Sequence, residues 1–310
     1  MTWLNQTMVS EFILLGFSDL GELQVLLFMV FLLIYMLTVT GNFLIILLTK
    51  MDAALHSPMY FFLRNLSFAD LGFVSCIIPK MLVNLLSKEK TISLSGCRTQ
   101  MYFAFFFGAT ECFILIVMAY DRFVAICHPL RYTVIMNSRL CAWLLIVVWS
   151  AGLPLAIINS TWLFTFPFCK SNVVSHFYCD FPPVFQLACG NTSTFELFSI
   201  VGTFIVILFP FSLILISYVH IISTIFRMPT TEGRRKAFST CSSHITAVTL
   251  FYGTAGLNYV QPRSSYSPES KYLLSVSYIV ITPMLNPIIY SLRNREVKGA
   301  LWRFFGRKKY

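Results

Sequence analysis

The chain has 310 residues, of which 57% are hydrophobic and 12% are charged, about half the charged fraction of ordinary soluble domains. A soluble domain of this length folds around one core and exposes a polar surface, which this composition cannot provide. The net charge of +10 raises nucleic acid as a partner, but the placement of the basic residues excludes it, as shown below. The composition predicts a membrane protein.

Seven apolar blocks follow one another along the chain, each near the length of about 20 residues that crosses a bilayer as a helix. They cover residues 23–49, 58–86, 94–126, 140–163, 196–226, 237–261 and 271–291. No remaining stretch is long enough for a separate soluble domain. We therefore predict a single all-α domain over residues 1–310, a bundle of seven transmembrane helices.

Most of the 23 Lys and Arg residues fall in the segments on one side of these spans, among them Lys50, Arg131 and the tail "RFFGRKKY". The positive-inside rule places that side in the cytosol and the N-terminus outside the cell. The basic excess is therefore a topology signal rather than a nucleic-acid signal. The tail adds a weak attraction to anionic membrane lipid.

The outer segments carry the features of an oxidising compartment. An even number of the nine cysteines lies there, so we expect disulfides, although four cysteines allow three connectivities and spacing does not choose between them. Two disulfides would make the long loop 164–195 an ordered lid. Asn5 begins a glycosylation sequon in the N-terminal segment. The outer cysteines are Cys97, Cys169, Cys179 and Cys189.

Asp70 and Glu111 lie in the middle of the second and third spans, and neither has a basic neighbour at helical spacing. Buried carboxylates without a cation protonate or bind a metal ion. We expect a small cation, sodium, between the two helices. The alternative is a hydrogen-bonded pair that shares a proton.

Asp121 and Arg122 end the third span, in "MAYDRFVAICHPL". At that depth we expect the two charges to pair and to reach water, because Arg can extend to the interface. Composition does not distinguish a structural latch from a regulated switch. Beyond the seventh span, "RNREVKGALWRFF" predicts a short interfacial amphipathic helix over 293–305, with a disordered tail as the alternative.

Prolines interrupt several of the apolar blocks. Each removes a backbone hydrogen bond and can kink its helix, which favours a bundle that rearranges, although proline is also common in membrane helices. These residues are Pro79, Pro154, Pro210, Pro283 and Pro287.

The outer half of the bundle has room for a ligand. Small residues in "MYFAFFFGATE" and "LFYGTAGLNYVQP" leave volume, and aromatic residues supply walls. The third span holds no carboxylate between Cys97 and Thr110, so a cationic amine would lack a counter-ion there. We expect a small, neutral, mostly apolar ligand; the alternative for any one aromatic is helix packing or lipid contact.

Several long runs resemble the rhodopsin-like G-protein-coupled receptors, and within them the odorant receptors of the tetrapod type. The runs extend from the first span to the tail, and together they are specific to this family. They are "GN" (41–42), "LHSPMYFFL" (55–63), "MAYDRFVAIC" (118–127), "SHFYCD" (175–180), "KAFSTCSSH" (236–244), "FYG" (251–253) and "PMLNPIIYSLRN" (283–294).

The resemblance implies residue roles. Cys97 would pair with Cys179, and Cys169 with Cys189; Asp70 and Glu111 match the family's sodium-site acids. Arg122 would face the G protein after activation, held until then by Asp121. The residues implied to rearrange with them are Tyr218, Lys236, His244, Asn286, Pro287 and Tyr290. One departure is Phe123, where the family usually has Tyr, so any contact through that hydroxyl is in doubt.

The resemblance also implies that a neutral odorant activates a stimulatory, olfactory-type G protein, which raises cyclic AMP at the plasma membrane, in the cilia of olfactory neurons. The implied pocket residues are Ala104, Phe105, Gly108, Ala109, Asn159, Phe181, Gly202, Thr203, Val206, Tyr252, Ala255, Gly256, Tyr259, Val276 and Ile279. No cofactor is required, and the sodium ion between Asp70 and Glu111 is the one further bound species that we expect.

Other functions fit less well. A transporter or channel could use Asp70 and Glu111 as an ion path, but no inverted repeat is visible and seven spans are an odd number for a duplication. A retinal photoreceptor needs a Lys within the seventh span, and residues 272–291 contain none. An intramembrane hydrolase needs a nucleophile and a base together, and His244 has no evident partners. We therefore expect a receptor and not an enzyme.

Overall fold

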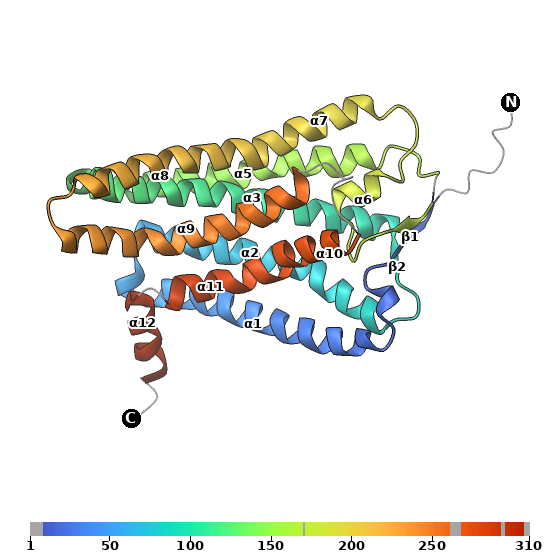
Figure 1. Cartoon of the computed structure of the whole chain (residues 1–310), viewed down its shortest axis with the longest axis horizontal. Helices are drawn as coiled ribbons and strands as arrows, with labels where there is room; N and C mark the ends of the chain where they lie inside the picture. The colour runs from blue at the N-terminus through green and yellow to red at the C-terminus, as the bar shows by residue number, and fades with distance from the viewer. Residues whose placement is uncertain (1–8, 170, 261–267, 293–294, 307–310) are drawn as a thin grey trace.

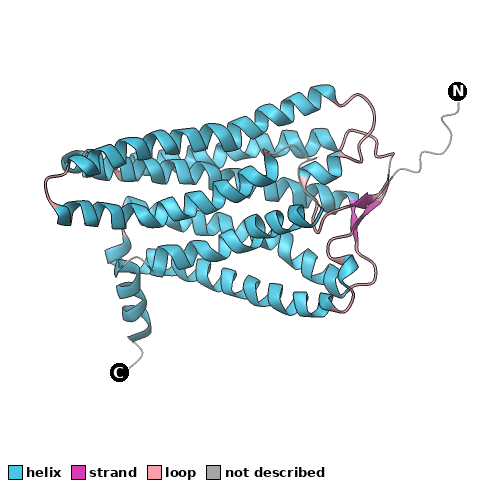
Figure 2. Ribbon diagram, in the orientation of Figure 1, coloured by secondary structure: helices cyan, strands magenta, loops and turns pink. Residues whose placement is uncertain are grey.

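The computed structural model describes residues 9–169, 171–260, 268–292 and 295–306, and it confirms the seven-helix fold. The helices lie side by side (Figure 1), and the strands gather at one end (Figure 2). We call the end with the strands the outer end and the other the inner end. The long helices are α1 (Leu23–Met51), α2 (Pro58–Leu86), α3 (Leu94–Cys127), α5 (Ser138–Leu163), α7 (Ser193–Thr203) continued by η4 (Phe204–Leu208) and α8 (Phe209–Arg227), α9 (Thr231–Tyr259), and α10 (Pro268–Val276) continued by η6 (Ser277–Ile281) and α11 (Thr282–Leu292).

Local signals explain where several helices begin. The Ser93 hydroxyl accepts from the backbone N–H of Gly96 at 3.1 Å, and the Asn137 side chain accepts from that of Leu140 at 3.0 Å. Both satisfy N–H groups that a helix leaves without a partner in its first turn. α2 begins with Pro58, whose missing N–H costs nothing at this position.

Six of the helical rods in the described part of the chain are long and apolar enough to cross a membrane. α9 is not among them, because its first half, "TEGRRKAFSTCSSH", is polar. It nevertheless runs alongside the others (Figure 1). The sixth rod begins at Thr231, before the apolar block expected at 237–261, and its polar first half lies at the inner end (Figure 1).

Two rods contain a π-helical turn just before a proline. η4 precedes Pro210 and η6 precedes Pro283. Proline has no N–H to donate to the carbonyl four residues earlier, and those carbonyls, of Val206 and Ile279, lie inside the π turns. Such turns are frequent at functional sites, and both lie level with the cavity described below.

A small sheet closes the outer end, which the all-α prediction did not include. β1 (Glu11–Leu14) pairs antiparallel with β2 (Thr91–Ser93) and parallel with β3 (Val173–Val174). The central strand buries Phe12 and Leu14, which are 0% and 1% exposed, against a second apolar core. The sheet joins the N-terminal segment to the loop between α5 and α7.

The remaining elements are short. They are η1 (Ser18–Leu20), η2 (Ala53–Leu55), η3 (Pro129–Arg131), α4 (Tyr132–Ile135), α6 (Phe181–Phe185) and the inner-end helix α12 (Arg295–Gly306). α12 leaves the bundle at an angle (Figure 1) and buries Val297 and Ala300. Arg303 bonds to Asp52 at 2.8 Å, and the Tyr60 hydroxyl donates to Glu296 at 2.6 Å, so α12 is fixed to α2 and η2.

Candidate functional site

A cavity of about 90 Å³ lies in the outer half of the bundle. It is small against the ~300–1,000 Å³ of typical ligand sites, so its volume indicates a small ligand. Most of its walls are apolar. Of the residues expected there, it is lined by Ala104, Phe105, Gly108, Ala109, Asn159, Phe181, Gly202, Thr203, Val206, Ala255 and Tyr259.

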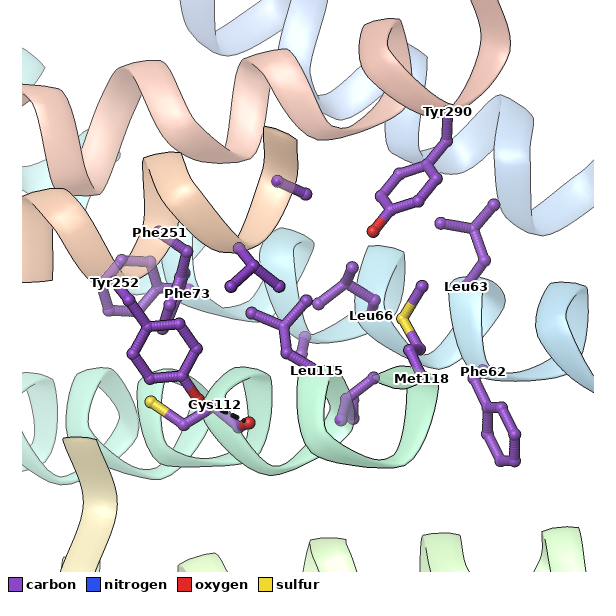
Figure 3. Close-up of a cluster of buried hydrophobic side chains, with 14 of the residues drawn as sticks. Phe62, Leu63, Leu66, Phe73, Cys112, Leu115, Met118, Phe251, Tyr252 and Tyr290 are labelled. Atoms are coloured by element: carbon purple, nitrogen blue, oxygen red, sulfur yellow. Dashed lines mark hydrogen bonds between the residues drawn. The ribbon is translucent and has the colours of Figure 1, made fainter. Parts of the chain in front are cut away.

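Four expected pocket residues do not line this cavity: Tyr252, Gly256, Val276 and Ile279. The Tyr252 hydroxyl donates to the carbonyl of Cys112 at 3.0 Å (Figure 3), and its ring packs on Phe251 and Phe211. Ile279 is 0% exposed inside the π turn η6. Tyr252 and Ile279 pack between helices, and neither presents a face to the cavity.

The long outer loop supplies wall residues that we did not predict, Tyr178, Cys179 and Asp180. The disulfide between Cys97 and Cys179 ties this loop to the top of α3, and the Gln100 side chain accepts from the Cys179 N–H at 2.9 Å. The run "HFYCD" contains Cys179, whose expected bond to Cys97 could have indicated that these loop residues lie close to α3 and the cavity. The other unpredicted wall residues are Phe73, Met101, Cys112, Ser199, Ile207 and Tyr278.

The structure contains both disulfides that the resemblance implied. Cys97 pairs with Cys179, and Cys169 pairs with Cys189. The loop is held at both of its halves and also pairs with β1 through β3, so the expected ordered lid is present. Asn5, the predicted glycosylation site, lies outside the described residues.

The cavity has one polar corner. The Tyr259 hydroxyl donates to the Asp180 carboxylate at 3.2 Å and lies 3.3 Å from the Tyr178 hydroxyl. Asp180 also accepts from the N–H of Phe181 at 2.9 Å. The carboxylate absent from α3 is thus supplied by the loop, but it already has protein partners.

At the inner end, Arg122 and Asp121 form an ion pair of 2.6 Å. The predicted pairing is present, but the expected access to water is wrong: Asp121 is 0% exposed and Arg122 9%. Surrounding helices cover the pair, and the Tyr132 hydroxyl of α4 donates to the second Asp121 oxygen at 2.8 Å. Buried charges of this kind are stable only when paired and hydrogen-bonded.

Other expected inner residues lie around this pair. The Tyr218 hydroxyl of α8 and Nδ1 of His244 of α9 are 2.6 Å apart, and Tyr290 of α11 is buried. Lys236 is exposed on α9, away from the buried group. The structure therefore brings together residues of α3, α8, α9 and α11 at the inner end.

Asp70 and Glu111 are in side-chain contact, as expected, and they are 0% and 1% exposed. The Asn286 side chain donates to both Asp70 oxygens, at 3.1 and 3.0 Å. One oxygen of Glu111 is buried without a partner. Pro287 follows Asn286 and packs close to Gly41 of α1. The described residues contain no cluster of three or more metal-ligating side chains, so a cation here would have two carboxyl groups and the Asn286 amide.

An apolar core fills the bundle between the outer cavity and the inner pair. Figure 3 shows Leu115 and Met118 of α3 packed near Leu66 of α2, with the Tyr290 ring directed toward them from α11. Cys112, the innermost α3 residue of the cavity wall, is about 15 Å from Arg122 by helix rise. Packed side chains therefore connect the cavity wall to the ion pair without a break.

A seven-helix membrane bundle with a lidded outer cavity and a buried Asp-Arg pair at its inner end is the architecture of a G-protein-coupled receptor. The olfactory receptor family model matches residues 31–308. The chain is 57% identical to human olfactory receptor 10A7 over 98% of this chain and 96% of that one, and 59% identical to human olfactory receptor 10A5 over 97% and 95%. It is 48% identical to the dog olfactory receptor-like protein OLF3 over 97% and 95%. The chain belongs to the olfactory receptor family and is a multi-pass membrane receptor, not an enzyme.

Proposed function

We propose that this receptor binds a small, neutral, mostly apolar odorant in the outer cavity and then activates a stimulatory, olfactory-type G protein, which raises cyclic AMP. The N-terminus would be extracellular, and the receptor would act in the plasma membrane of olfactory cilia. The apolar outer cavity, connected by packed core to a buried ion pair, supports this proposal best.

The walls favour a neutral ligand. Asp180 already accepts from Tyr259 and Phe181, so a cation would have to compete with those hydrogen bonds. Asn159 also lines the cavity, but its amide donates to the Leu155 carbonyl at 2.9 Å. An odorant with one hydrogen-bonding group near the polar corner and an apolar body fits these walls.

The odorant would act by favouring one of two bundle states. Only a difference in affinity between the states shifts their populations. The resting state holds Arg122 on Asp121, and the active state would release Arg122 to the G protein.

A matched pair of glycine variants tests the cavity. A Cβ added at Gly202 or at Gly256 meets no atom within 4 Å, but Gly202 alone lines the cavity. Cells with a cyclic AMP reporter are first screened with a chemically diverse odorant panel. For the best odorant, Gly202→Leu should weaken the potency at least about tenfold, the cost of losing roughly 1.4 kcal/mol of binding. Gly256→Leu should not, and equal loss in both variants would reject this cavity as the site.

A second variant tests the inner pair. Arg122→Ala should abolish the odorant-evoked cyclic AMP rise while the receptor remains at the cell surface. Normal signalling by this variant would reject the role of Arg122 in activation.

We also propose a sodium ion between Asp70 and Glu111. The partnerless Glu111 oxygen and the absence of a basic residue in ion-pair contact with either acid, among the described residues, support a cation there. The alternative remains a carboxyl pair that shares one proton.

A further inference from the structure

A second and larger cavity, of about 640 Å³, opens at the inner end. We call it the inner cleft. It lies between the loop joining α1 to α2 and the loop joining α3 to α5, away from the outer cavity, and its lining does not include Asp121 or Arg122. It is lined by Thr49, Lys50, Leu55, His56, Ser57, Pro58, Phe61, Arg64, Tyr132, Thr133, Met136, Asn137, Ser138 and Cys141.

The side chains of the inner cleft are those that bind phosphate. Lys50 and Arg64 are cationic, and His56, Thr133 and Ser138 add donors. Among the described residues, the ion pairs are Arg122 with Asp121 and Arg303 with Asp52, so neither cation of the cleft is neutralised by a carboxylate. The cleft lining itself contains no acidic residue. Its field is therefore positive.

The backbone adds to this field. α2 begins at Pro58 and α5 at Ser138, and both first turns border the inner cleft. Helix N-termini carry a partial positive charge and N–H groups without a helical partner. The Arg64 guanidinium lies 5.2 Å from the centre of the Phe61 ring, a contact that holds it at the cleft wall.

Next to the cleft, the outer surfaces of α2 and α5 carry exposed apolar side chains. Phe68 of α2 is 56% exposed and Ile146 of α5 is 55% exposed, and the Phe68 ring contacts Trp149 of α5 at 5.7 Å. The Trp149 indole donates to the Asn65 side chain at 3.3 Å. This hydrogen bond joins α5 to α2 next to the cleft. An apolar surface thus continues from a cationic cleft, the arrangement that suits a lipid with an anionic head and acyl tails.

We propose that the inner cleft binds the headgroup of a polyanionic phospholipid, a phosphoinositide, of the cytosolic leaflet. The proposal depends on the inner end being cytosolic, where anionic lipids attract basic residues. The cleft volume exceeds what a single phosphate ion would fill and suits an inositol ring with several phosphates. Tyr132 lines the cleft and also holds Asp121, so the bound lipid would touch the segment that steadies the ion pair.

The test uses the full-length receptor in phosphatidylcholine nanodiscs, with and without phosphatidylinositol bisphosphate. The cleft variant combines Lys50→Gln, His56→Gln and Arg64→Gln. The control combines Arg227→Gln, Arg235→Gln and Lys298→Gln, three exposed basic residues outside the cleft. Lipid binding, measured by native mass spectrometry and by the rise in melting temperature, should weaken at least about tenfold in the cleft variant, as expected for the loss of cationic contacts. It should stay near wild type in the control.

Equal binding by the two variants would overturn the proposal. Inorganic phosphate, added to receptor in phosphatidylcholine alone, should not reproduce the rise in melting temperature; an equal rise would assign the cleft to free phosphate and reject the lipid.

A photoreactive phosphoinositide on the wild-type receptor covers the case in which the cleft variant misfolds. Cross-links should map to residues 49–64 and 132–141. Cross-links confined to α12 or to residues 227–236 would also reject the site.

Discussion

Tyr132 gives Asp121 the phenol hydroxyl that position 123 lacks. The Phe123 ring packs on His128 and His220, with ring centres 5.6 and 6.1 Å away. Burial and the Asp121 carboxylate raise the pKa of Tyr132, so its hydroxyl stays protonated and donates to Asp121. The resting ion pair therefore depends on α4, and the residue at 123 contributes packing.

This arrangement predicts that two single variants differ in their basal cyclic AMP. Tyr132→Phe should raise basal cyclic AMP by about tenfold or more, because a hydrogen bond to a charged group contributes about 1.5–3 kcal/mol and about 1.4 kcal/mol is a factor of ten. Phe123→Tyr should leave basal cyclic AMP near the wild-type value. Both are measured without odorant at matched surface expression. A change in basal cyclic AMP in Phe123→Tyr, with none in Tyr132→Phe, would show that position 123 governs the pair.

His176 predicts a pH dependence of stability. Its ring is buried in the outer loop, with Nε2 3.0 Å from the Ser275 hydroxyl, which donates to Asn258. Its other neighbours are the rings of Phe177, Tyr178 and Tyr272, and none of its neighbours among the described residues is charged. Burial lowers the pKa of His176 from 6.5 to about 3.

The unfolded chain therefore binds a proton at His176 below about pH 6.5 that the folded receptor does not bind until about pH 3. The free energy of unfolding must fall as the pH falls through that range. The loss is about 2 kcal/mol at about pH 5. This loss of stability is measured as the difference in melting temperature of the purified receptor between about pH 7.5 and about pH 5. The drop should be smaller in His176→Gln, and an unchanged drop would assign it to other groups.

At the scale of elements, β1 orders the outer loop. Phe12 is 0% exposed and contacts Phe164 and Phe168, with ring centres 6.5 and 5.2 Å away. These contacts join the N-terminal segment to the end of α5 and to the lid, beside the cavity.

Phe12→Ala should therefore destabilise the receptor by about 3–5 kcal/mol, the cost of emptying a buried aromatic site. Leu15→Ala, at a side chain 38% exposed, should cost little. Thermal melting and odorant potency are measured for both. A Phe12→Ala receptor with wild-type melting and potency would show that β1 does not support the lid.

The sequence allowed the rods to be predicted but not this strand. Apolar blocks of spanning length mark helices because every backbone group in a bilayer must be bonded within its own segment. β1 has four residues, "EFIL", and its partners lie far along the chain, so pairing rather than pattern defines it. The π turns were also missed, since a proline indicates a broken hydrogen bond and not which geometry replaces it.

For the whole molecule, most of the cavity residues that were predicted correctly lie on the rods, although Tyr252 and Ile279, also on rods, do not line the cavity. Ala104 and Gly108 were expected as small residues of the third span and through the family resemblance, whereas Tyr178 and Asp180 reach the cavity through a loop whose path depends on the Cys97–Cys179 bond. The burial of Asp121 was missed for a similar reason. The position of a residue within a span indicates its depth in the membrane, but not which other helices cover its side chain.

Asp70, Glu111 and Asn286 join α2, α3 and α11 in the middle of the bundle. A cation bound there would be held by three helices, so it would stabilise the arrangement in which they meet. Anything that binds only the folded receptor raises its stability with concentration. If sodium is the occupant, the melting temperature should rise with sodium chloride relative to choline chloride at equal ionic strength.

Glu111→Gln should abolish this sodium dependence, because the amide removes one anionic ligand while keeping the size of the side chain. Glu196→Gln, at an exposed acid of α7, is the matched control and should keep it. The alternative, two carboxyl groups that share a proton, predicts equal melting in both salts for the wild type and both variants. With that outcome, sodium would not link the three helices. It would then have no part in keeping Arg122 paired with Asp121.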